Sequence, residues 1–232
     1  ITRLWESRDT CGSYLPEIGA SGGVVMACVH GYERLPSLVQ LSDDGERVIL
    51  GLGDLGSPVG GIEEARWTST DGTEIEGLLV TPDTPGPHPL VVHIHGGPAW
   101  AWRNSWSMHF PYTPLFAGCG YAVLHPNPRG SVGRGQQFVR DGLYDMGGLD
   151  AHDIERGVDA LSASGRIDAR RVGVTGGSYG GFMSAWLAAT SDRFAAAAPR
   201  SPVTDWVSQH YTSNLSAFDR IALRGDPLAA KS

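Results

Sequence analysis

A serine flanked by glycines is the pattern in this chain with the clearest chemistry. The segment VGVTGGSYGGFM contains Gly176-x-Ser178-x-Gly180, between an apolar run at 172–175 and a small-residue, helix-like run at 182–189. A strand, a sharp turn and a helix in this order form a nucleophile elbow, which presents a serine hydroxyl at the end of a sheet. Glycines tolerate the strained turn and allow strand and helix to approach closely. We predict that Ser178 is a catalytic nucleophile; the alternative is a glycine-rich structural turn.

Two backbone N–H groups are candidates for stabilising the oxyanion that a serine nucleophile would generate. One is the amide of Tyr179, at the N-terminus of the predicted helix. The other lies in His-Gly-Gly-Pro, residues 95–98, where a glycine amide can face a substrate with no Cβ in the way. Gly97 is the preferred donor and Gly96 the second choice; the alternative is a tight strand-exit turn. His95 is not assigned as the base, because the order in α/β-hydrolases is serine, acid, histidine.

A second glycine-rich loop, 127–135, follows an apolar run at 120–124. Ligands bind at the carboxyl ends of strands in open α/β sheets, so Arg129 is a candidate for holding a substrate carboxylate or carbonyl. The loop lacks the Gly-Lys-Ser/Thr ending of a phosphate-binding P-loop. The alternative, which we favour, is an ion pair with Asp150 or Asp153 that pins the loop.

Aromatic and histidine side chains surround the 95–98 segment. Trp100, Trp102 and Trp106 either wall an apolar substrate pocket, with Trp100 as the candidate binding residue, or pack as buried residues of a helix that starts there. His93 and His95 alternate with apolar residues, and no third ligand follows at a recognisable spacing. We therefore expect structural or loop-shaping roles for both histidines, no metal site and no cofactor.

The elements that must position these residues fall into two segments. Residues 1–55 are typical of β-structure with too small a core to stand alone, with strands expected at 24–29, 37–41 and 47–50. A Gly/Pro-rich stretch, 51–61, is expected to be a linker, so that the second domain covers 56–232.

The second segment alternates strands with helices. A hairpin is expected at 66–80 around Asp71-Gly72, further strands at 90–95, 120–124, 172–175 and 194–198, and helices at 150–161, with Asp150 as N-cap, and at 182–189. Such alternation predicts an α/β fold: a mostly parallel sheet with helices on both faces.

The overall composition excludes several classes of protein. The 232 residues carry a net charge of −7 and no basic stripe, which argues against a nucleic-acid partner. Apolar runs are too short for a membrane span. Three widely spaced cysteines form no disulfide framework, and no signal peptide is visible after Ile1. A cytoplasmic location is therefore expected.

Five segments in this order resemble the prolyl oligopeptidase family of serine peptidases, in particular its acylaminoacyl-peptidase and dipeptidyl-peptidase branch. They are HGGP, GYAVLHPNPRGSVGRG, GGLDAHDIERGVDAL, RVGVTGGSYGGFM and PVTDW. The resemblance implies an α/β-hydrolase domain preceded by a β-propeller, with residues 1–55 as its last blade. It implies Ser178 as nucleophile and the Tyr179 and Gly97 amides as oxyanion hole. The prolyl oligopeptidase branch proper has a tyrosine in place of His95, which favours a hole made of backbone amides only.

The activating acid and base are not evident. The only histidine after Ser178 is His210, and the carboxylates are Asp192, Asp205, Asp219 and Asp226. In this fold the acid and the histidine follow separate strands, and a βαβ unit takes about 30 residues or more, so too few residues follow Pro199. We expect both groups in a further segment or a partner chain. The preferred function is a peptidase that cleaves short peptides through an acyl-enzyme on Ser178; the alternatives are an esterase or lipase, and an inactive fragment or scaffold subunit.

Overall fold

The computed structural model describes residues 5–7, 9–12, 17–53, 58–109, 112–143, 145–223 and 225–228. Two compact units are present. The N-terminal unit comprises Ile1–Ile62, Val80–Asp83 and Arg103–Cys119, and the α/β unit comprises Glu63–Leu79, Thr84–Trp102 and Gly120–Ser232. The predicted linker at 51–61 lies mainly at the end of the N-terminal unit, and its residues 54–57 are outside the described part of the chain.

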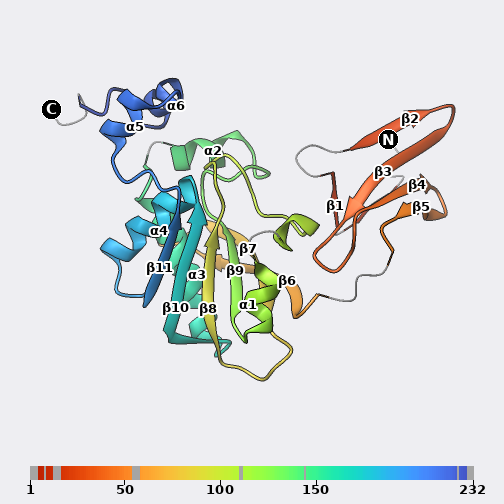
Figure 1. Ribbon diagram of the computed structural model, residues 1–232, viewed down its shortest axis with the longest axis horizontal. Helices are drawn as coiled ribbons and strands as arrows, with labels where there is room; N and C mark the ends of the chain where they lie inside the picture. Colours follow the sequence, from red (N-terminus) through yellow and green to blue (C-terminus); the bar gives the residue numbers. More distant parts are fainter. Residues whose placement is uncertain are drawn as a thin grey trace. The chain divides into compact units, whose positions relative to one another are not determined.

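The N-terminal unit contains an antiparallel sheet (Figure 1). Its order is β1-β3-β4-β5, with β2 paired to β3; the strands are β1 (Thr10–Cys11), β2 (Ile18–Ser21), β3 (Val24–His30), β4 (Ser37–Ser42) and β5 (Gly45–Gly51). The three predicted strands are confirmed, whereas β1 and β2 were not expected. Ala27, Val29, Val39 and Leu41 alternate along β3 and β4 and form one small core. This unit also contains η1 (Trp106–His109) and α1 (Thr113–Gly118).

The α/β unit is built on a six-stranded sheet of order β11-β10-β8-β9-β7-β6. The strands are β6 (Gly61–Thr68), β7 (Glu74–Thr81), β8 (His88–Ile94), β9 (Ala122–Asn127), β10 (Ile167–Gly177) and β11 (Ala196–Arg200). β8 pairs in parallel with both β9 and β10, and β10 pairs in parallel with β11. The predicted hairpin and parallel strands are therefore present. Gly176 lies opposite Ile94 in the register, so the loops after β8 and β10 leave the sheet at the same edge.

The described part of this unit contains the helices α2 (Gln136–Leu143), α3 (Leu149–Ala163), α4 (Tyr179–Thr190), α5 (Trp206–Thr212) and α6 (Ser216–Ala222). The predicted helices correspond to α3 and α4, and the others were not expected. The N-cap of α3 is Gly148, so the assignment of Asp150 as N-cap was wrong. Asp150 lies inside the first turn, where its carboxylate accepts hydrogen bonds from nearby amides instead.

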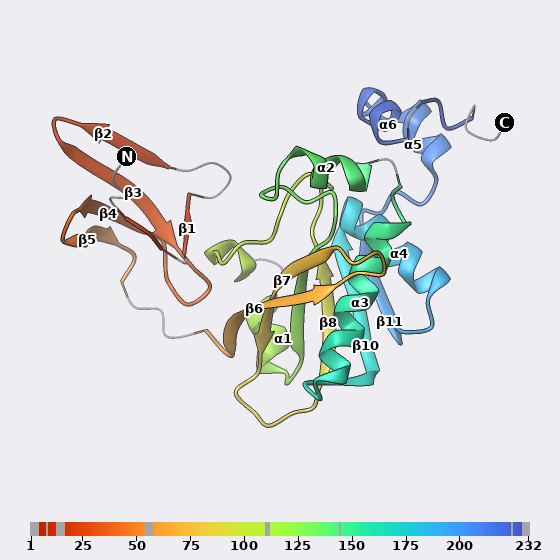
Figure 2. The same cartoon turned by 180° about the vertical axis from the view of Figure 1, so that it is seen from behind.

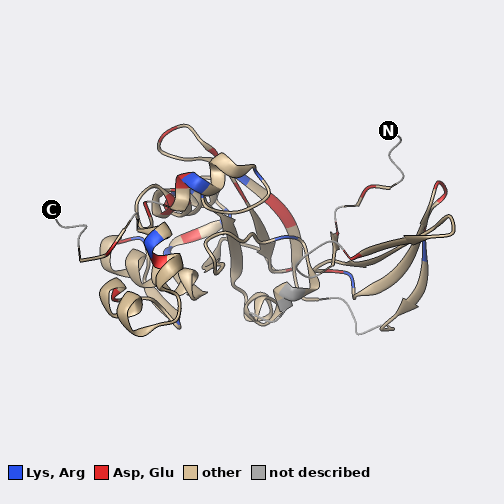
Figure 3. Ribbon diagram, turned by 90° about the horizontal axis from the view of Figure 1, so that it is seen from above, with Lys and Arg blue, Asp and Glu red and all other residues tan. Residues whose placement is uncertain are grey.

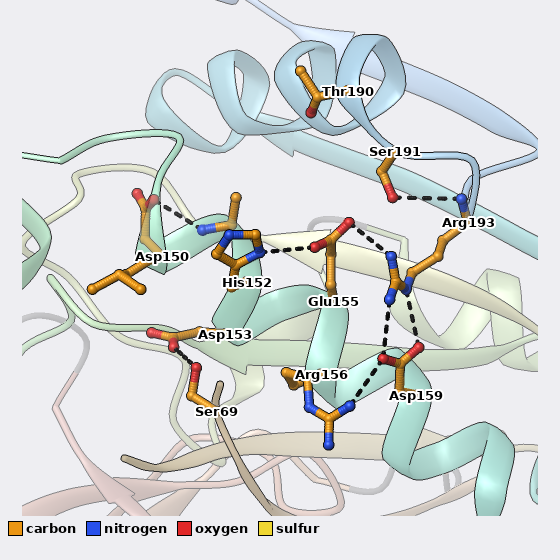
Figure 4. A network of polar contacts seen from close by, with 12 residues as sticks. Ser69, Asp150, His152, Asp153, Glu155, Arg156, Asp159, Thr190, Ser191 and Arg193 are labelled. Carbon is orange, nitrogen blue, oxygen red and sulfur yellow. Dashed lines mark hydrogen bonds and ion pairs between the residues drawn. The ribbon is translucent and has the colours of Figure 1, made fainter. Parts of the chain in front are cut away.

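Helices α3 and α4 lie beside each other on one face of the sheet (Figure 2). Ile154 and Val158 of α3 and Met183 and Leu187 of α4 share a core with buried strand residues such as Leu90. At the surface, Arg193 after α4 bonds to Glu155 and Asp159 of α3 (Figure 4). The expectation that helices also cover the opposite face of the sheet stays a prediction.

In the described residues the positive and negative side chains are mixed, as expected from a sequence without a basic stripe. Figure 3 shows both charge signs scattered over the strands and helices of the α/β unit. Among the residues described, no helix is long and apolar enough to cross a lipid bilayer.

Candidate active site

Ser178 occupies the sharp turn between β10 and α4. Its backbone has φ 60° and ψ −118°, a region that a non-glycine residue enters only at a cost of about 1–3 kcal/mol. The side chain is exposed at the carboxyl end of β10, and the Ser178 N–H donates to the Arg200 carbonyl oxygen of β11 at 3.1 Å. The backbone strain and the exposure of Ser178 are the geometry expected of a nucleophile elbow.

The glycines around Ser178 are required by contacts with neighbouring backbone. A Cβ on Gly176 would lie 2.5 Å from the Ile94 carbonyl oxygen, and one on Gly180 would overlap that same oxygen and lie 2.7 Å from that of His95. Real Cβ atoms do not approach carbonyl oxygens so closely, so larger residues would push the elbow away from the end of β8. Gly176 and Gly180 thus allow the elbow after β10 to pack closely against the end of β8.

The loop after β8 lies directly against the nucleophile. A Cβ on Gly96 would be 3.7 Å from the Ser178 Cβ, and Gly97 has φ +123°, a conformation that favours glycine. The carbonyl oxygen of Gly96 bonds to His95 Nδ1 at 2.7 Å. In a trans peptide the N–H points opposite to the C=O, so the Gly97 N–H faces away from the imidazole. The Gly97 N–H has no hydrogen-bond partner in the part of the chain that the structure describes.

His95 is a buried, neutral residue in this loop. Burial lowers the pKa of His95 to about 4, against the opposing effect of its hydrogen bond with Gly96. Because a carbonyl can only accept, Nδ1 carries the ring proton. Nε2 lies 2.9 Å from the Ser131 hydroxyl, which is also 2.6 Å from the Pro128 carbonyl oxygen. These contacts favour the expected loop-shaping role.

Arg129 is committed to carboxylates of its own chain. Its guanidinium holds Asp153 of α3 through Nε at 2.9 Å and Nη2 at 2.8 Å, and holds Asp71 of the β6–β7 turn through Nη1 at 2.8 Å. The side chain is only 5% exposed. Ser69 also donates to Asp153 (Figure 4). The ion pair with Asp153 that we favoured is therefore present, and contact of Arg129 with a substrate stays a prediction.

Trp100 and Trp102 lie in a non-helical segment, 98–105, and only Trp106 begins a helix, the short 3-10 helix η1. Trp102 is buried and donates its indole N–H to the His93 carbonyl oxygen at 2.9 Å. Trp100 is half-buried and lies edge-on to both His95 and Trp102. Trp100 thus flanks the 95–98 loop, and its contact with substrate stays a prediction.

The candidate acid and base after Ser178 do not reach it. His210 of α5 is buried with its Nδ1 3.7 Å from Asp219 Oδ2 of α6, and Asp205 caps α5 by accepting from the Val207 and Ser208 amides. No histidine or carboxylate bonds to the Ser178 hydroxyl in the portion of the chain described. That portion also holds no group of acidic, cysteine and histidine side chains that could bind a metal ion.

The side chain of Tyr179 is a feature that the sequence analysis missed. Its hydroxyl donates to Asp150 Oδ2 at 2.6 Å, inside the protein. The sequence did hold a signal that Asp150 would need a hydrogen-bonding partner. Asp150 precedes the apolar positions of a predicted helix, and a carboxylate that is buried there requires such partners. The sequence pattern gave no indication of which partner.

Comparisons with known proteins identify the family. The model of the prolyl oligopeptidase family matches residues 106–229. The uncharacterized peptidase YuxL of Bacillus subtilis is 39% identical over 160 residues, which are 67% of this chain and 24% of that protein. The acylamino-acid-releasing enzyme of Rattus norvegicus is 34% identical over 139 residues, 58% of this chain and 19% of the enzyme.

A solved structure extends the match to the fold. An acylaminoacyl peptidase in complex with Z-Gly-Gly-Phe-chloromethyl ketone superposes with a TM-score of 0.84 at 26% identity, covering 96% of this chain and 36% of that one. This chain therefore spans about a fifth to just over a third of these relatives, and its α/β unit has the α/β-hydrolase fold. On the family match and the geometry around Ser178, the chain belongs to the prolyl oligopeptidase family, whose members are serine peptidases.

Proposed function

We propose that the protein containing this chain is a serine peptidase that hydrolyses short peptides through an acyl-enzyme on Ser178. The observation that carries the proposal is the exposed serine at φ 60°, with the Gly96–Gly97 loop packed against it. The names of the relatives, acylamino-acid-releasing enzyme and dipeptidyl-peptidase 5, support a peptide substrate.

In the proposed chemistry this chain supplies the nucleophile and the oxyanion donors. The Ser178 hydroxyl attacks the scissile carbonyl carbon, and its proton passes to a base. The carbonyl oxygen becomes an oxyanion, which accepts hydrogen bonds from the Tyr179 N–H at the start of α4 and from the Gly97 N–H. Collapse of the tetrahedral intermediate breaks the C–N bond, the amine leaves with the proton that the base took from Ser178, and an ester stays on Ser178, which water then hydrolyses.

A serine needs a base and a carboxylate that orients it. We assign both to sequence beyond these residues, in the same polypeptide or in a partner chain, because His210 and Asp219 face each other instead. The propeller identity of the N-terminal unit is part of the same proposal.

The test is labelling of the full-length protein with a fluorophosphonate probe, which acylates activated serines. We expect Ser178→Ala to abolish labelling and peptide hydrolysis, and Ser162→Ala, the same change on α3, to preserve both. Labelling that persists in Ser178→Ala would overturn the assignment. Peptide anilides and short acyl esters should be compared in parallel, because turnover of esters alone would indicate an esterase.

A further inference from the structure

We propose that Asp150 is a positioning residue that acts on the oxyanion hole through the side chain of Tyr179. This inference rests on the proposed function, since it concerns the amide of Tyr179 as an oxyanion donor. The juxtaposition that carries it is a buried carboxylate of α3 bonded to the residue that directly follows the nucleophile.

The two oxygens of Asp150 have separate partners. Oδ1 accepts from the Gly147 and Ala151 amides at 2.9 Å each, which fixes the carboxylate to the start of α3. Oδ2 accepts from the Tyr179 hydroxyl at 2.6 Å. Asp150 is 1% exposed and has no cationic partner among the residues described. Attachment to its own helix therefore uses one oxygen, and the other serves the elbow.

Tyr179 connects the Asp150 carboxylate to the proposed oxyanion hole. Its backbone begins α4 next to the strained Ser178, and its ring lies between Phe182 of the same helix and His95 of the loop after β8, with centroid distances of 6.2 and 6.4 Å. Fixing the phenol at its far end restricts rotation of the residue whose N–H would bind the oxyanion. Displacements of about 1 Å at such donors cost much of their effect.

The Tyr179 side chain also supports the second proposed donor, the Gly97 N–H, through His95. His95, which lies against the Tyr179 ring, bonds through Nδ1 to the Gly96 carbonyl oxygen and thereby orients the Gly97 N–H. One chain of contacts, from Asp150 through Tyr179 and His95, thus supports both proposed donors. Loss of the Asp150 bond would loosen them together.

The charge of Asp150 sets the strength of the bond. Burial is the main cause that raises the pKa of Asp150 to about 7, with a further rise from Asp153, while the bonds from Tyr179, Ala151 and Gly147 oppose it. Burial and Asp150 raise the pKa of Tyr179, so the phenol stays a donor. As a carboxylate, Asp150 accepts a charge-assisted bond; once protonated, it accepts a weaker neutral one.

Two further titratable groups face this pair. Asp153 of α3 forms an ion pair with Arg129 of the loop after β9, and His95 has a pKa that burial lowers to about 4. Asp150 is thus the group whose proton near pH 7 changes the support of Tyr179. The hole should weaken as pH falls below 7.

The test uses the full-length protein with Asp150→Asn, Tyr179→Phe and the double variant, each normalised to its titrated active sites. Each single variant is expected to lower kcat on a peptide anilide about 10-fold, less than the 10²–10³ that follows loss of a whole donor, with KM within about twofold. The double variant should lose no more than either single one, because each already breaks the same bond. Asp145→Asn, the same change at an exposed residue that bonds to Leu149, should retain full kcat.

The pH profile separates positioning from simple structural support. The acid limb of kcat should contain two ionisations in the wild type, and one should vanish in Asp150→Asn. The inference would be overturned if both single variants kept the wild-type kcat per active site and the wild-type pH profile. It would also be overturned if the loss of kcat in the double variant were the product of the two single losses. If wild-type Ser178 does not label at all, the proposed function fails instead. Should Asp150→Asn not fold, Tyr179→Phe still decides the matter.

Discussion

Two carboxylates one turn apart on α3 serve two different regions of the α/β unit. Asp153 faces the loop after β9 and is 0% exposed, held by the guanidinium of Arg129. Asp150 faces the elbow and is 1% exposed, held by the Tyr179 phenol and two amides. The two carboxylates are therefore equally buried, and they differ only in their hydrogen-bonding and ion-pair partners.

This difference separates a fixed region from a tunable one. A guanidinium is protonated at all accessible pH values, so the Arg129–Asp153 pair keeps one arrangement. Asp150 has no such cation, and burial raises its pKa to about 7, so we expect its protonation to change near neutral pH and to weaken the bond from Tyr179. The loop after β9 is thus a rigid support, whereas we expect the elbow to respond to pH through Asp150.

Removal of the cation from the rigid region should give the largest effect. Arg129→Met leaves Asp153 buried without its partner, and breaking such a pair costs about 3–5 kcal/mol of unfolding free energy. Urea unfolding measures the loss. Arg193→Met, which removes partly exposed pairs with Glu155 and Asp159, is the control and should cost about 1 kcal/mol or less. A raised KM with unchanged stability would restore Arg129 as a substrate ligand.

The tunable region predicts an intermediate effect that depends on pH. The folded-state pKa of Asp150, about 7, lies above its ordinary value of 3.8, so folding favours the protonated form. The stability that this proton contributes is full below the ordinary pKa and is lost as pH rises to about 7. Wild-type stability should therefore fall between pH 4 and 7, by up to about 4 kcal/mol from this site, and Asp150→Asn should remove that slope. Equal slopes in both proteins would contradict the assignment.

The smallest effect is expected at the exposed edge of the rigid region. Asp71 is 38% exposed and bonds to Arg129, whose hydrogen bond holds the pKa of Asp71 well below its ordinary value. Such a group stabilises the fold above its ordinary pKa, and the contribution disappears in acid. Asp71→Asn should cost about 1 kcal/mol or less at pH 7, and progressively less as pH falls below the ordinary pKa of 3.8, as measured by thermal melts. A loss as large as that of Arg129→Met would mean that Asp71, not Asp153, neutralises the guanidinium.

The sequence predicted the elements with strong local patterns. Alternating or apolar runs placed β3, β4, β8 and β10, and the glycines of the elbow placed the turn at Ser178. The short helices α2, α5 and α6 were missed, because seven or eight residues carry too little periodicity to stand out from loops. The N-cap of α3 was placed two residues late, since an aspartate near a helix start serves equally well as cap or as first-turn residue.

For the site, the sequence by itself determined the nucleophile and the two glycine-rich loops, because strand, turn and helix signals are local and glycine tolerates what other residues cannot. Only the tertiary structure decided the partners. It paired Arg129 with Asp153 and not Asp150, and it set Tyr179 between Asp150 and His95. The physical reason is that these contacts join residues 24 to 84 positions apart, whose meeting depends on strand order and register and not on any local pattern.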